Sequence, residues 1–211
     1  MSRAPWNHNI AYFPFILGVI GEKPRRNALD VGSGDGMLAA QIAGIVPRVV
    51  GLDINAHQVD VAAATYGDVP GLTFELGDLL DATPDGAPFD GAPFDGAPFD
   101  IVTISATIHH LELAPALERL KLLTAPGGTL IVVGLALDGT FGDFLISAAT
   151  APIVRLARAV RGWHEHNAPK HDARDSWSTV RGVSRDILPG SIFKRCLYWR
   201  YTLVWNNTSS A

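Results

Sequence analysis

The segment NALDVGSGDGMLAAQIA, residues 27–43, constrains the fold of this chain more than any other part of the sequence. It begins with a short apolar run, Ala28–Val31, which predicts a buried strand, and it ends in a pattern that predicts a helix. Between the two lie three glycines, Gly32, Gly34 and Gly36. Because glycine adopts backbone conformations that other residues avoid, this order predicts an open parallel α/β sheet with a ligand at the turn.

The alternation of strand and helix continues to residue 134. Further strands are predicted at residues 49–54, 72–76, 101–105 and 129–134, and further helices at 56–66 and 113–123. The apolar faces of the helices are predicted from residues three or four apart: Leu38, Ile42 and Ile45, then Ala56, Val59, Ala63 and Tyr66, then Leu113, Leu117, Leu120 and Thr124. Strands separated by such helices indicate βαβ units and one mostly parallel sheet.

Both ends of the chain add to this core. Residues 10–20, IAYFPFILGVI, are too few to span a bilayer as a helix, and they predict a buried helix within an N-terminal helical cover at residues 1–24. After residue 134 a helix is predicted at 176–188. The β-rich tail at 191–205 predicts one or two closing strands, antiparallel to the others.

Composition excludes several classes of protein. A length of 211 residues with 47% hydrophobic and 18% charged residues predicts one ordered globular domain. The net charge of −4 disfavours nucleic-acid binding, which usually needs a positive field, and no membrane segment is expected. The single cysteine, Cys196, cannot form an internal disulfide and fits a reducing compartment, so we predict a cytoplasmic location. The sequence leaves the oligomeric state open.

Acidic residues gather where the predicted strands end. Asp30 lies beside the glycine turn and Asp35 at the start of the helix, while Asp53 ends the second strand and Asp78 follows the third. Each alone is explained equally well as a helix cap or a surface residue. Together they fall at the carboxyl ends of successive strands, which form the ligand crevice of open α/β sheets.

The spacing and the charge of this turn discriminate between cofactors. Dinucleotide-binding turns favour G-x-G-x-x-G, where the third glycine permits close packing over a pyrophosphate. Here the pattern is D-x-G-x-G-x-G, and its acids, Asp30 and Asp35, would repel a diphosphate. They suit a ligand that carries an ammonium or sulfonium charge, which favours S-adenosylmethionine over NAD. Asp53 is placed where its carboxylate can accept both ribose hydroxyls.

Residues 26–134 carry five motifs in order: ALDVGSGDG, GLDI, LGD, FDIVTISATIHHLE and LTAPGGTLIVVG. They resemble the successive motifs of class I S-adenosylmethionine-dependent methyltransferases of the small bacterial kind. The resemblance implies a Rossmann-like, doubly wound α/β fold with a seven-stranded, mostly parallel sheet and an antiparallel last strand. It also implies S-adenosylmethionine as the cofactor, S-adenosylhomocysteine as the product, and a cofactor-binding core at residues 25–135.

The resemblance further implies which residues contact the cofactor. The segment from Asp30 to Gly36 would cradle the amino-acid end, Asp53 would hold the ribose and Ile54 would pack on adenine. Asp78 and Leu79 would contact the base, and Ser105 would lie beside the methionine portion. The cofactor-binding set is therefore Asp30, Gly32, Ser33, Gly34, Gly36, Asp53, Ile54, Asp78, Leu79 and Ser105.

Methyl transfer to oxygen or nitrogen can need a base poised near neutral pH, and histidine is the usual choice. His109 and His110 follow the fourth strand at the crevice edge and are the catalytic candidates. Neighbouring residues of a helix point in different directions, so we do not expect both to act together. Capping of the following helix, or lining of the cofactor pocket, would explain them equally well.

Residues 138–175 leave the fifth strand at its carboxyl end and are predicted to form a helical substrate lid. Substrate-contact candidates are Trp163, His164 and His166 in this lid and Tyr12 in the N-terminal cover. Trp163 and Tyr12 have an alternative as core residues. No metal site is expected, because H-x-H spacing without a fixed scaffold is a weak metal-binding pattern.

Three copies of DGAPF occupy residues 85–99. They precede the fourth strand, so they enter the sheet at its amino end, opposite the crevice. Phe99 and Asp100 of the last PFD are expected to enter the core and open the strand. The other copies are interpreted as a surface loop, since each doubling of loop length costs only about 0.6 kcal/mol. A partner-binding motif is the alternative.

Two functions follow from these patterns. The first is a methyltransferase that transfers a methyl group to an O, N or C atom of an unidentified small molecule. The second is a non-catalytic module of the same fold that only binds S-adenosylmethionine.

Overall fold

The structure is a computed structural model that describes residues 9–82, 98–138, 173–196 and 199–209. The strands are β1 (Ala28–Val31), β2 (Val49–Asp53), β3 (Leu72–Leu76), β4 (Phe99–Ser105), β5 (Thr124–Leu135), β6 (Ile192–Arg195) and β7 (Arg200–Asn206). The α-helices are α1 (Phe13–Ile20), α2 (Met37–Ala43), α3 (Ala56–Tyr66), α4 (Leu113–Leu123) and α6 (Trp177–Ile187). Two 3-10 turns are η1 (Ile10–Tyr12) and η2 (Ile108–His110).

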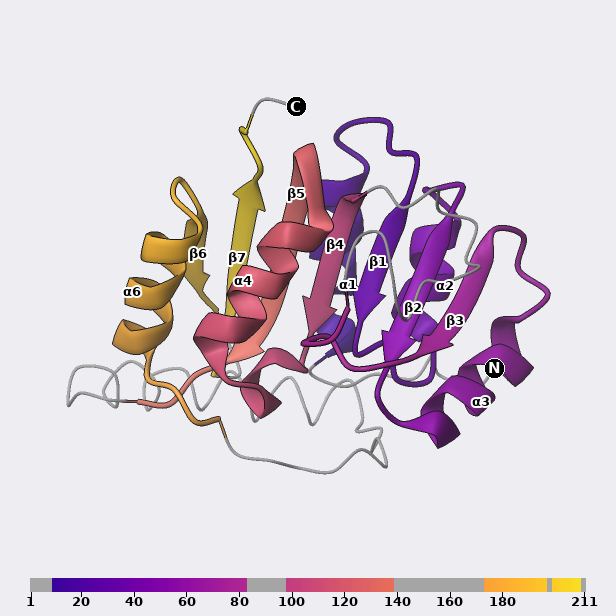
Figure 1. Cartoon of the computed structure of the whole chain (residues 1–211), viewed down its shortest axis with the longest axis horizontal. Helices are drawn as coiled ribbons and strands as arrows, with labels where there is room; N and C mark the ends of the chain where they lie inside the picture. The colour runs from indigo at the N-terminus through magenta and orange to yellow at the C-terminus, as the bar shows by residue number, and fades with distance from the viewer. Residues whose placement is uncertain (1–8, 83–97, 139–172, 197–198, 210–211) are drawn as a thin grey trace.

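Within the described residues the strands form one seven-stranded sheet in the order β3-β2-β1-β4-β5-β7-β6 (Figure 1). Neighbours among β1 to β5 pair in parallel, whereas β7 runs antiparallel to β5 and β6 antiparallel to β7. The predicted seven-stranded, doubly wound fold is confirmed, and the β-rich tail supplies two strands. The last strand, β7, is antiparallel to the others as predicted, whereas β6 runs in the same direction as β1 to β5. The direction of strand order reverses between β1 and β4, and open α/β sheets bind ligands at such a point.

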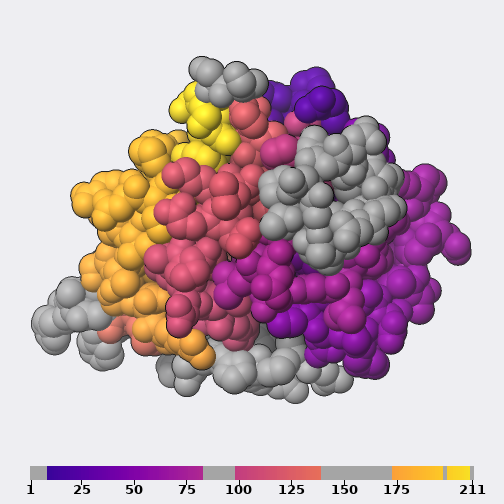
Figure 2. Space-filling model, in the orientation of Figure 1, coloured from indigo at the N-terminus to yellow at the C-terminus, as the bar shows by residue number. Residues whose placement is uncertain are grey.

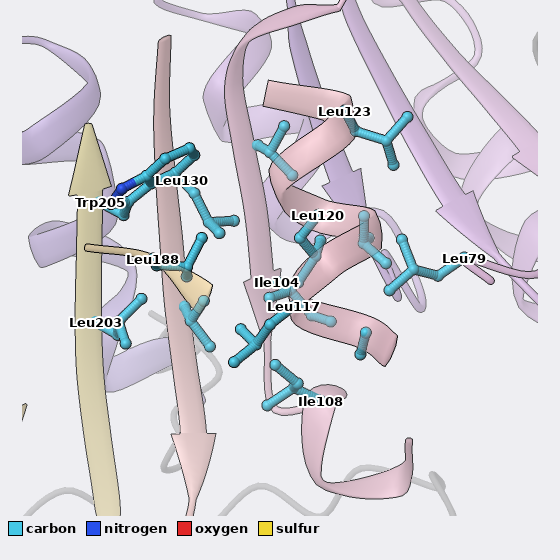
Figure 3. Close-up of a cluster of buried hydrophobic side chains, with 14 of the residues drawn as sticks. Leu79, Ile104, Ile108, Leu117, Leu120, Leu123, Leu130, Leu188, Leu203 and Trp205 are labelled. Atoms are coloured by element: carbon cyan, nitrogen blue, oxygen red, sulfur yellow. The ribbon is translucent and has the colours of Figure 1, made fainter. Parts of the chain in front are cut away.

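Helices cover both faces of the sheet. α4 and α6 lie on the face shown in Figure 2, and their apolar residues pack on β4, β5 and β7. In Figure 3, Leu117 and Leu120 of α4 point toward Ile104 of β4, while Leu203 and Trp205 of β7 lie beside Leu188. The opposite face carries α1 and α2, whose cluster includes Ile16 and Ile42. Both faces are thus apolar and buried, as a parallel sheet requires.

Side-chain caps fix where two helices begin. Asn55 precedes α3, and its side-chain oxygen accepts hydrogen bonds from the backbone N–H groups of His57 and Gln58. Ser176 precedes α6 and accepts from the N–H of Thr179. Each cap satisfies backbone amides that the helix itself leaves without partners.

Three predicted helix faces need correction. Ile45 is 48% exposed because α2 ends at Ala43; Val46 is buried in its place. In α3 the predicted stripe holds for Tyr66, which is half-buried against the core, and is wrong for Ala56 and Ala63, which are exposed; Ala62 is the buried residue. A small residue suits that position, because α3 lies close to the glycine turn there. Thr124 belongs to β5, not to the face of α4.

The end of the repeat enters the sheet as expected. Phe99 is buried and opens β4, one residue before Asp100. Arg26 makes two hydrogen bonds to the Asp100 carboxylate through its guanidinium, at 3.2 and 3.0 Å, and a third through its backbone N–H at 2.8 Å. Pairing of Phe99 with Thr124 is followed by a register shift, so β4 and β5 both begin earlier than predicted. Residues 83–97, which hold the other copies, lie outside the described residues.

Across the parts of the chain that the structure describes, none of the helices has the length and apolar character needed to cross a bilayer.

Candidate functional site

The three glycines of the turn differ in what surrounds them. Gly32 has φ +67°, and a Cβ there would lie 2.2 Å from the Thr107 hydroxyl oxygen. Gly36 has φ +81°, and its Cβ would lie 2.7 Å from the Phe74 ring. Gly34 also has a positive φ, +54°, but a Cβ there would meet nothing within 4 Å. Close packing therefore demands glycine at two positions, whereas the third faces open space.

That open space belongs to a cavity of about 420 Å³ at the carboxyl edge of β1, β2 and β4. Its volume falls within the range of small-molecule sites. Nine of the ten predicted cofactor-binding residues line it: Asp30, Gly32, Ser33, Gly34, Asp53, Ile54, Asp78, Leu79 and Ser105. The tenth, Gly36, starts α2 as its N-cap and contributes by letting Phe74 pack against the turn.

Asp30 is a carboxyl group held almost entirely out of water. It is 2% exposed on the central strand β1, and the Thr103 hydroxyl donates a 2.7 Å hydrogen bond to it. Burial raises the pKa of Asp30 to about 7, with a smaller contribution from the charge of Asp53, although the hydrogen bond from Thr103 opposes the shift. A cation in the cavity would favour its ionised form.

Asp53 ties the glycine turn to the end of β2. One carboxylate oxygen accepts from the N–H of Gly34 at 2.8 Å, and the other accepts from the N–H of Asn55 at 2.9 Å. Each oxygen keeps a second acceptor position. The next residue, Ile54, lines the cavity with an apolar side chain that is 70% exposed. Such a side chain offers a flat ligand a surface to cover.

Asp78 both caps a turn and lines the cavity, so it fits the two interpretations, cap and ligand contact, that the sequence left open. Its carboxylate accepts a 2.9 Å hydrogen bond from the N–H of Leu80, so it caps the short turn that follows β3. It also lines the cavity, together with the 4% exposed Leu79.

Two serine hydroxyls add unused polar atoms to the wall. Ser33 follows β1 and Ser105 ends β4, and both line the cavity. Neither Oγ atom has a hydrogen-bond partner among the described residues, although both are buried. Buried hydroxyls without partners are uncommon, and a bound polar ligand would satisfy them.

The two histidines lie in η2, a 3-10 turn, and not at the start of α4. Their ring centroids are 4.1 Å apart, so the prediction that they point in different directions is wrong. His110 lines the cavity, whereas His109 is 9% exposed and does not. The N-cap of α4 is Glu112, without a side-chain cap bond, so neither histidine caps this helix. Only His110 keeps the geometry of a catalytic candidate.

The N-terminal segment covers the cavity through residues other than Tyr12. Asn9 and Phe13 line the cavity, and Tyr12, between them in the chain, does not. Sequence patterns give no signal for Phe13, Gln58 or Thr107, which also line it. Their side chains are common in cores and on helix surfaces, so only the fold brings them to the site.

The remaining predicted contacts, Trp163, His164 and His166, lie outside the described residues. The described ends of the predicted lid lie side by side, because the N–H of Leu137 donates to the carbonyl of Asp175 at 2.8 Å. Among the residues with described positions, no group of histidine, cysteine, aspartate and glutamate side chains could hold a metal ion.

An open sheet in this strand order, with carboxylates around a glycine turn at its switch point, is the arrangement that the resemblance to class I S-adenosylmethionine-dependent methyltransferases implied. The cavity fits that cofactor: Gly34 leaves room for it, the acids suit its positive charge, and the serine hydroxyls lack other partners among the described residues.

Comparison with known proteins places the chain in a family. The family described as "Methyltransferase domain" matches residues 29–132. An uncharacterized methyltransferase of Mycobacterium tuberculosis is 32% identical over 203 residues, covering 95% of this chain and 96% of that protein. The chain therefore belongs to the methyltransferase family.

Solved structures share the fold at low identity. The N-methyltransferase NodS of Bradyrhizobium japonicum, in complex with S-adenosylhomocysteine, is 13% identical with a TM-score of 0.63, covering 95% of this chain and 87% of that one. An O-methyltransferase family protein of Burkholderia thailandensis is 19% identical with a TM-score of 0.63, covering 96% of this chain and 59% of that one.

Proposed function

We propose that this methyltransferase transfers the methyl group of S-adenosylmethionine to an O, N or C atom of a small molecule, and that the donor binds in the 420 Å³ cavity. The observation that carries the proposal is the arrangement of Asp30, Asp53 and Asp78 around the open space at Gly34. Together with Asp35, which also lines the cavity, these carboxylates favour a cationic ligand and disfavour a diphosphate.

The donor is expected to lie along the ends of four strands. Its amino-acid end would contact the turn from Asp30 to Gly34, with the Ser33 and Ser105 hydroxyls as donors to its carboxylate or as acceptors from its ammonium. The ribose would take the free acceptor positions of Asp53. The adenine would lie between Ile54 and Leu79, with Asp78 accepting from its amino group. Gly36 supports this arrangement by packing and not by contact.

The donor supplies a methyl group that is already activated, so the protein has mainly to align it with the acceptor and exclude water. His110 would remove a proton from an oxygen or nitrogen acceptor, a role supported by its place in the cavity lining. For a carbon acceptor that ionises readily, alignment alone would suffice.

We also propose the division of the chain into an N-terminal cover, a cofactor-binding core and a substrate lid. The cover is supported by Asn9 and Phe13 at the cavity. The lid is supported by the attachment of residues 138 and 173–175 at the carboxyl end of β5, where a lid can reach the cavity. A cytoplasmic location remains a prediction, supported by the single free cysteine, Cys196.

Two glycines provide a matched test of where the donor binds. Gly34 and Gly127 both have a positive φ, +54° and +75°, and both have nothing within 4 Å of an added Cβ. Substitution by alanine should cost each about 1–2 kcal/mol of backbone energy. Gly34→Ala should also weaken S-adenosylhomocysteine binding at least tenfold in calorimetry, because its methyl group enters the cavity, whereas Gly127→Ala should leave affinity unchanged.

Turnover is measured with methyl-labelled S-adenosylmethionine and a metabolite extract. Transfer of label to a small molecule supports the proposal. Tight donor binding with no transfer would instead indicate the non-catalytic binding module, and saturable NADH binding without S-adenosylhomocysteine binding would contradict the placement of the donor.

A further inference from the structure

The half of the sheet that carries β7 holds a buried arginine that has no salt bridge to any described carboxylate. Arg200 is 6% exposed and is the first residue of β7. It pairs with Leu135, the last residue of β5. Because β7 is antiparallel to β5, the start of β7 lies at the carboxyl edge of the sheet, which is the edge that holds the cavity.

The hydrogen bonds of this guanidinium are incomplete. Nη2 of Arg200 donates to the side-chain oxygen of Asn9. Nε and Nη1 are buried and have no hydrogen-bond partner among the described residues, and no carboxylate in those residues forms a salt bridge with it. Burial lowers the pKa of Arg200 to about 10, although the phenol of Tyr12 opposes the shift, so Arg200 still carries its charge at neutral pH. A buried cation with unused donors is costly unless an anion pairs with it.

A second arginine nearby shows what a satisfied guanidinium looks like in this fold. Arg195, on the neighbouring strand β6, donates to the Asp138 carboxylate at 3.0 Å and lies over the Trp177 ring, 4.2 Å from its centroid. Arg195 is thus held by a carboxylate and an aromatic face, whereas Arg200, which is more buried, has one neutral amide oxygen.

Asn9 connects Arg200 to the cavity. Asn9 lines the cavity wall and accepts the bond from Arg200, so the guanidinium lies one hydrogen bond behind that wall. The backbone at this edge is also strained. Ala106, which lines the cavity after β4, and Trp199, which precedes Arg200, are the non-glycine residues with positive φ among those described, at 56° and 55°. Strain of this kind tends to occur at functional sites.

We propose that Arg200 recognises an anionic group of the acceptor, a carboxylate or a similar oxyanion, and that this methyltransferase therefore acts on acidic small molecules. The inference rests on the proposed function. Arginine suits this role because its planar fork of donors matches two oxygens of a carboxylate.

Position assigns the anion to the acceptor and not to the donor. The acids that suit the donor lie in β1, at the end of β2 and just after β3, on one half of the sheet. Arg200 lies on β7, three strands beyond β1 in the strand order, which at about 4.8 Å per strand is about 14 Å away. The carboxylate of the donor's methionine portion would have to leave the glycine turn to reach it.

The test uses the full chain, saturated with S-adenosylhomocysteine, and benzoate as the probe. Wild-type protein should bind benzoate in calorimetry and should not bind benzamide, its neutral analogue. The affinity for inorganic phosphate, measured in the same way, shows whether the site prefers a planar or a tetrahedral oxyanion. Arg200→Met should weaken benzoate binding at least about tenfold, the loss expected for a charged hydrogen-bonded pair. It should leave S-adenosylhomocysteine affinity within about twofold. Arg195→Met is the matched control and should leave benzoate binding unchanged.

Thermal unfolding gives an independent readout. Without an added anion, Arg200→Met should melt at a higher temperature than wild type, because it removes an uncompensated buried charge, whereas Arg195→Met should melt lower. Benzoate should raise the melting temperature of wild type and not that of Arg200→Met. If Arg200→Met melts lower and benzoate has no effect on wild type, Arg200 is satisfied within the chain and the proposal is wrong.

Loss of S-adenosylhomocysteine binding in Arg200→Met, with Gly34→Ala also impaired, would assign the anion to the donor and overturn the proposal for the acceptor. Failure of the proposed function itself would look different, because wild-type protein would then bind no S-adenosylhomocysteine at all.

Discussion

Asp30→Asn tests the electrostatic basis of the site, because the carboxyl group is costly for the fold when it is ionised. The folded-state pKa of Asp30 is about 7, raised from 3.8 mainly by burial. Between these two values the folded protein holds a proton that the unfolded chain has released. The free energy of unfolding of wild type therefore falls as pH rises through this range and becomes flat above about pH 7.

The magnitude follows from the size of the shift. Each pH unit between the two pKa values changes the free energy of unfolding by about 1.36 kcal/mol, so the two units from pH 5 to pH 7 remove about 3 kcal/mol from wild type. The amide introduced by Asp30→Asn does not ionise, so the variant lacks this loss. That amide adds a constant cost or gain from its own hydrogen bonds, including the one from Thr103, and this constant cancels when two pH values are compared.

The assay is urea unfolding of ligand-free protein at pH 5 and pH 8 for wild type, Asp30→Asn and the control Asp60→Asn, which removes an exposed acid of α3. The stability of Asp30→Asn relative to wild type should rise by about 3 kcal/mol between the two pH values, and that of the control should not change. In parallel, Asp30→Asn should bind S-adenosylmethionine less tightly at pH 8. If the free energies of unfolding of Asp30→Asn and wild type differ by the same amount at both pH values, the argument that the buried carboxylate is retained for the ligand at the expense of stability is refuted.

Three further outcomes are expected. His110→Gln should lower kcat about a hundredfold or more with donor affinity unchanged, as measured by single-turnover transfer and calorimetry, whereas His109→Gln should alter stability and not transfer. Asp100→Asn should lower the free energy of unfolding at pH 7, because hydrogen bonds from its arginine partner outweigh burial and hold the pKa of the carboxyl below 3.8; the difference from wild type should disappear as acid titration carries the pH below that value. Deletion of residues 90–99 leaves one DGAPF copy in register with β4, so calorimetry should find unchanged donor affinity, and a large loss would favour a functional repeat.

The sequence predicts the half of the site that is made by local chain geometry. Strand, turn and helix are adjacent in sequence, so Gly32, Gly34 and Asp30 identify the turn directly, and Asp53 and Asp78 follow from where strands end. Parallel strands bring those ends to one edge of the sheet, which is why nine predicted residues share one cavity.

The spacing of apolar residues predicts burial wrongly where a helix ends before its apolar pattern does. Ile45 continues the spacing of α2, but the helix has already ended, so Ile45 is exposed and Val46 is buried. The pattern after β4 predicts two histidines that point in different directions, but they lie in a 3-10 turn with their ring centroids 4.1 Å apart. Boundaries set by capping and packing cannot be recovered from periodicity alone.

Contacts between residues distant in sequence leave no pattern to detect. The bond between Asn9 and Arg200 joins positions 191 residues apart, and it forms because β7 returns antiparallel beside β5. In the sequence, Arg200 is one polar residue in an alternating strand and would be expected on a solvent-facing side. Only the strand order shows that it is buried at the edge that holds the cavity.

The charges at this edge determine where transfer can occur. Carboxylates lie near the carboxyl ends of β1, β2 and β3, the buried guanidinium begins β7, and β4 and β5 lie between them. If a cationic donor binds over the first group and an anionic acceptor binds beside Arg200, the methyl group must pass over the end of β4. Ser105 ends that strand, and Ala106, with its positive φ, and His110 follow it at the cavity wall. The separation of charge along the sheet would thus orient both substrates before any proton moves, and it explains why a buried carboxyl group and a buried guanidinium, each unfavourable for folding alone, occur in one small domain.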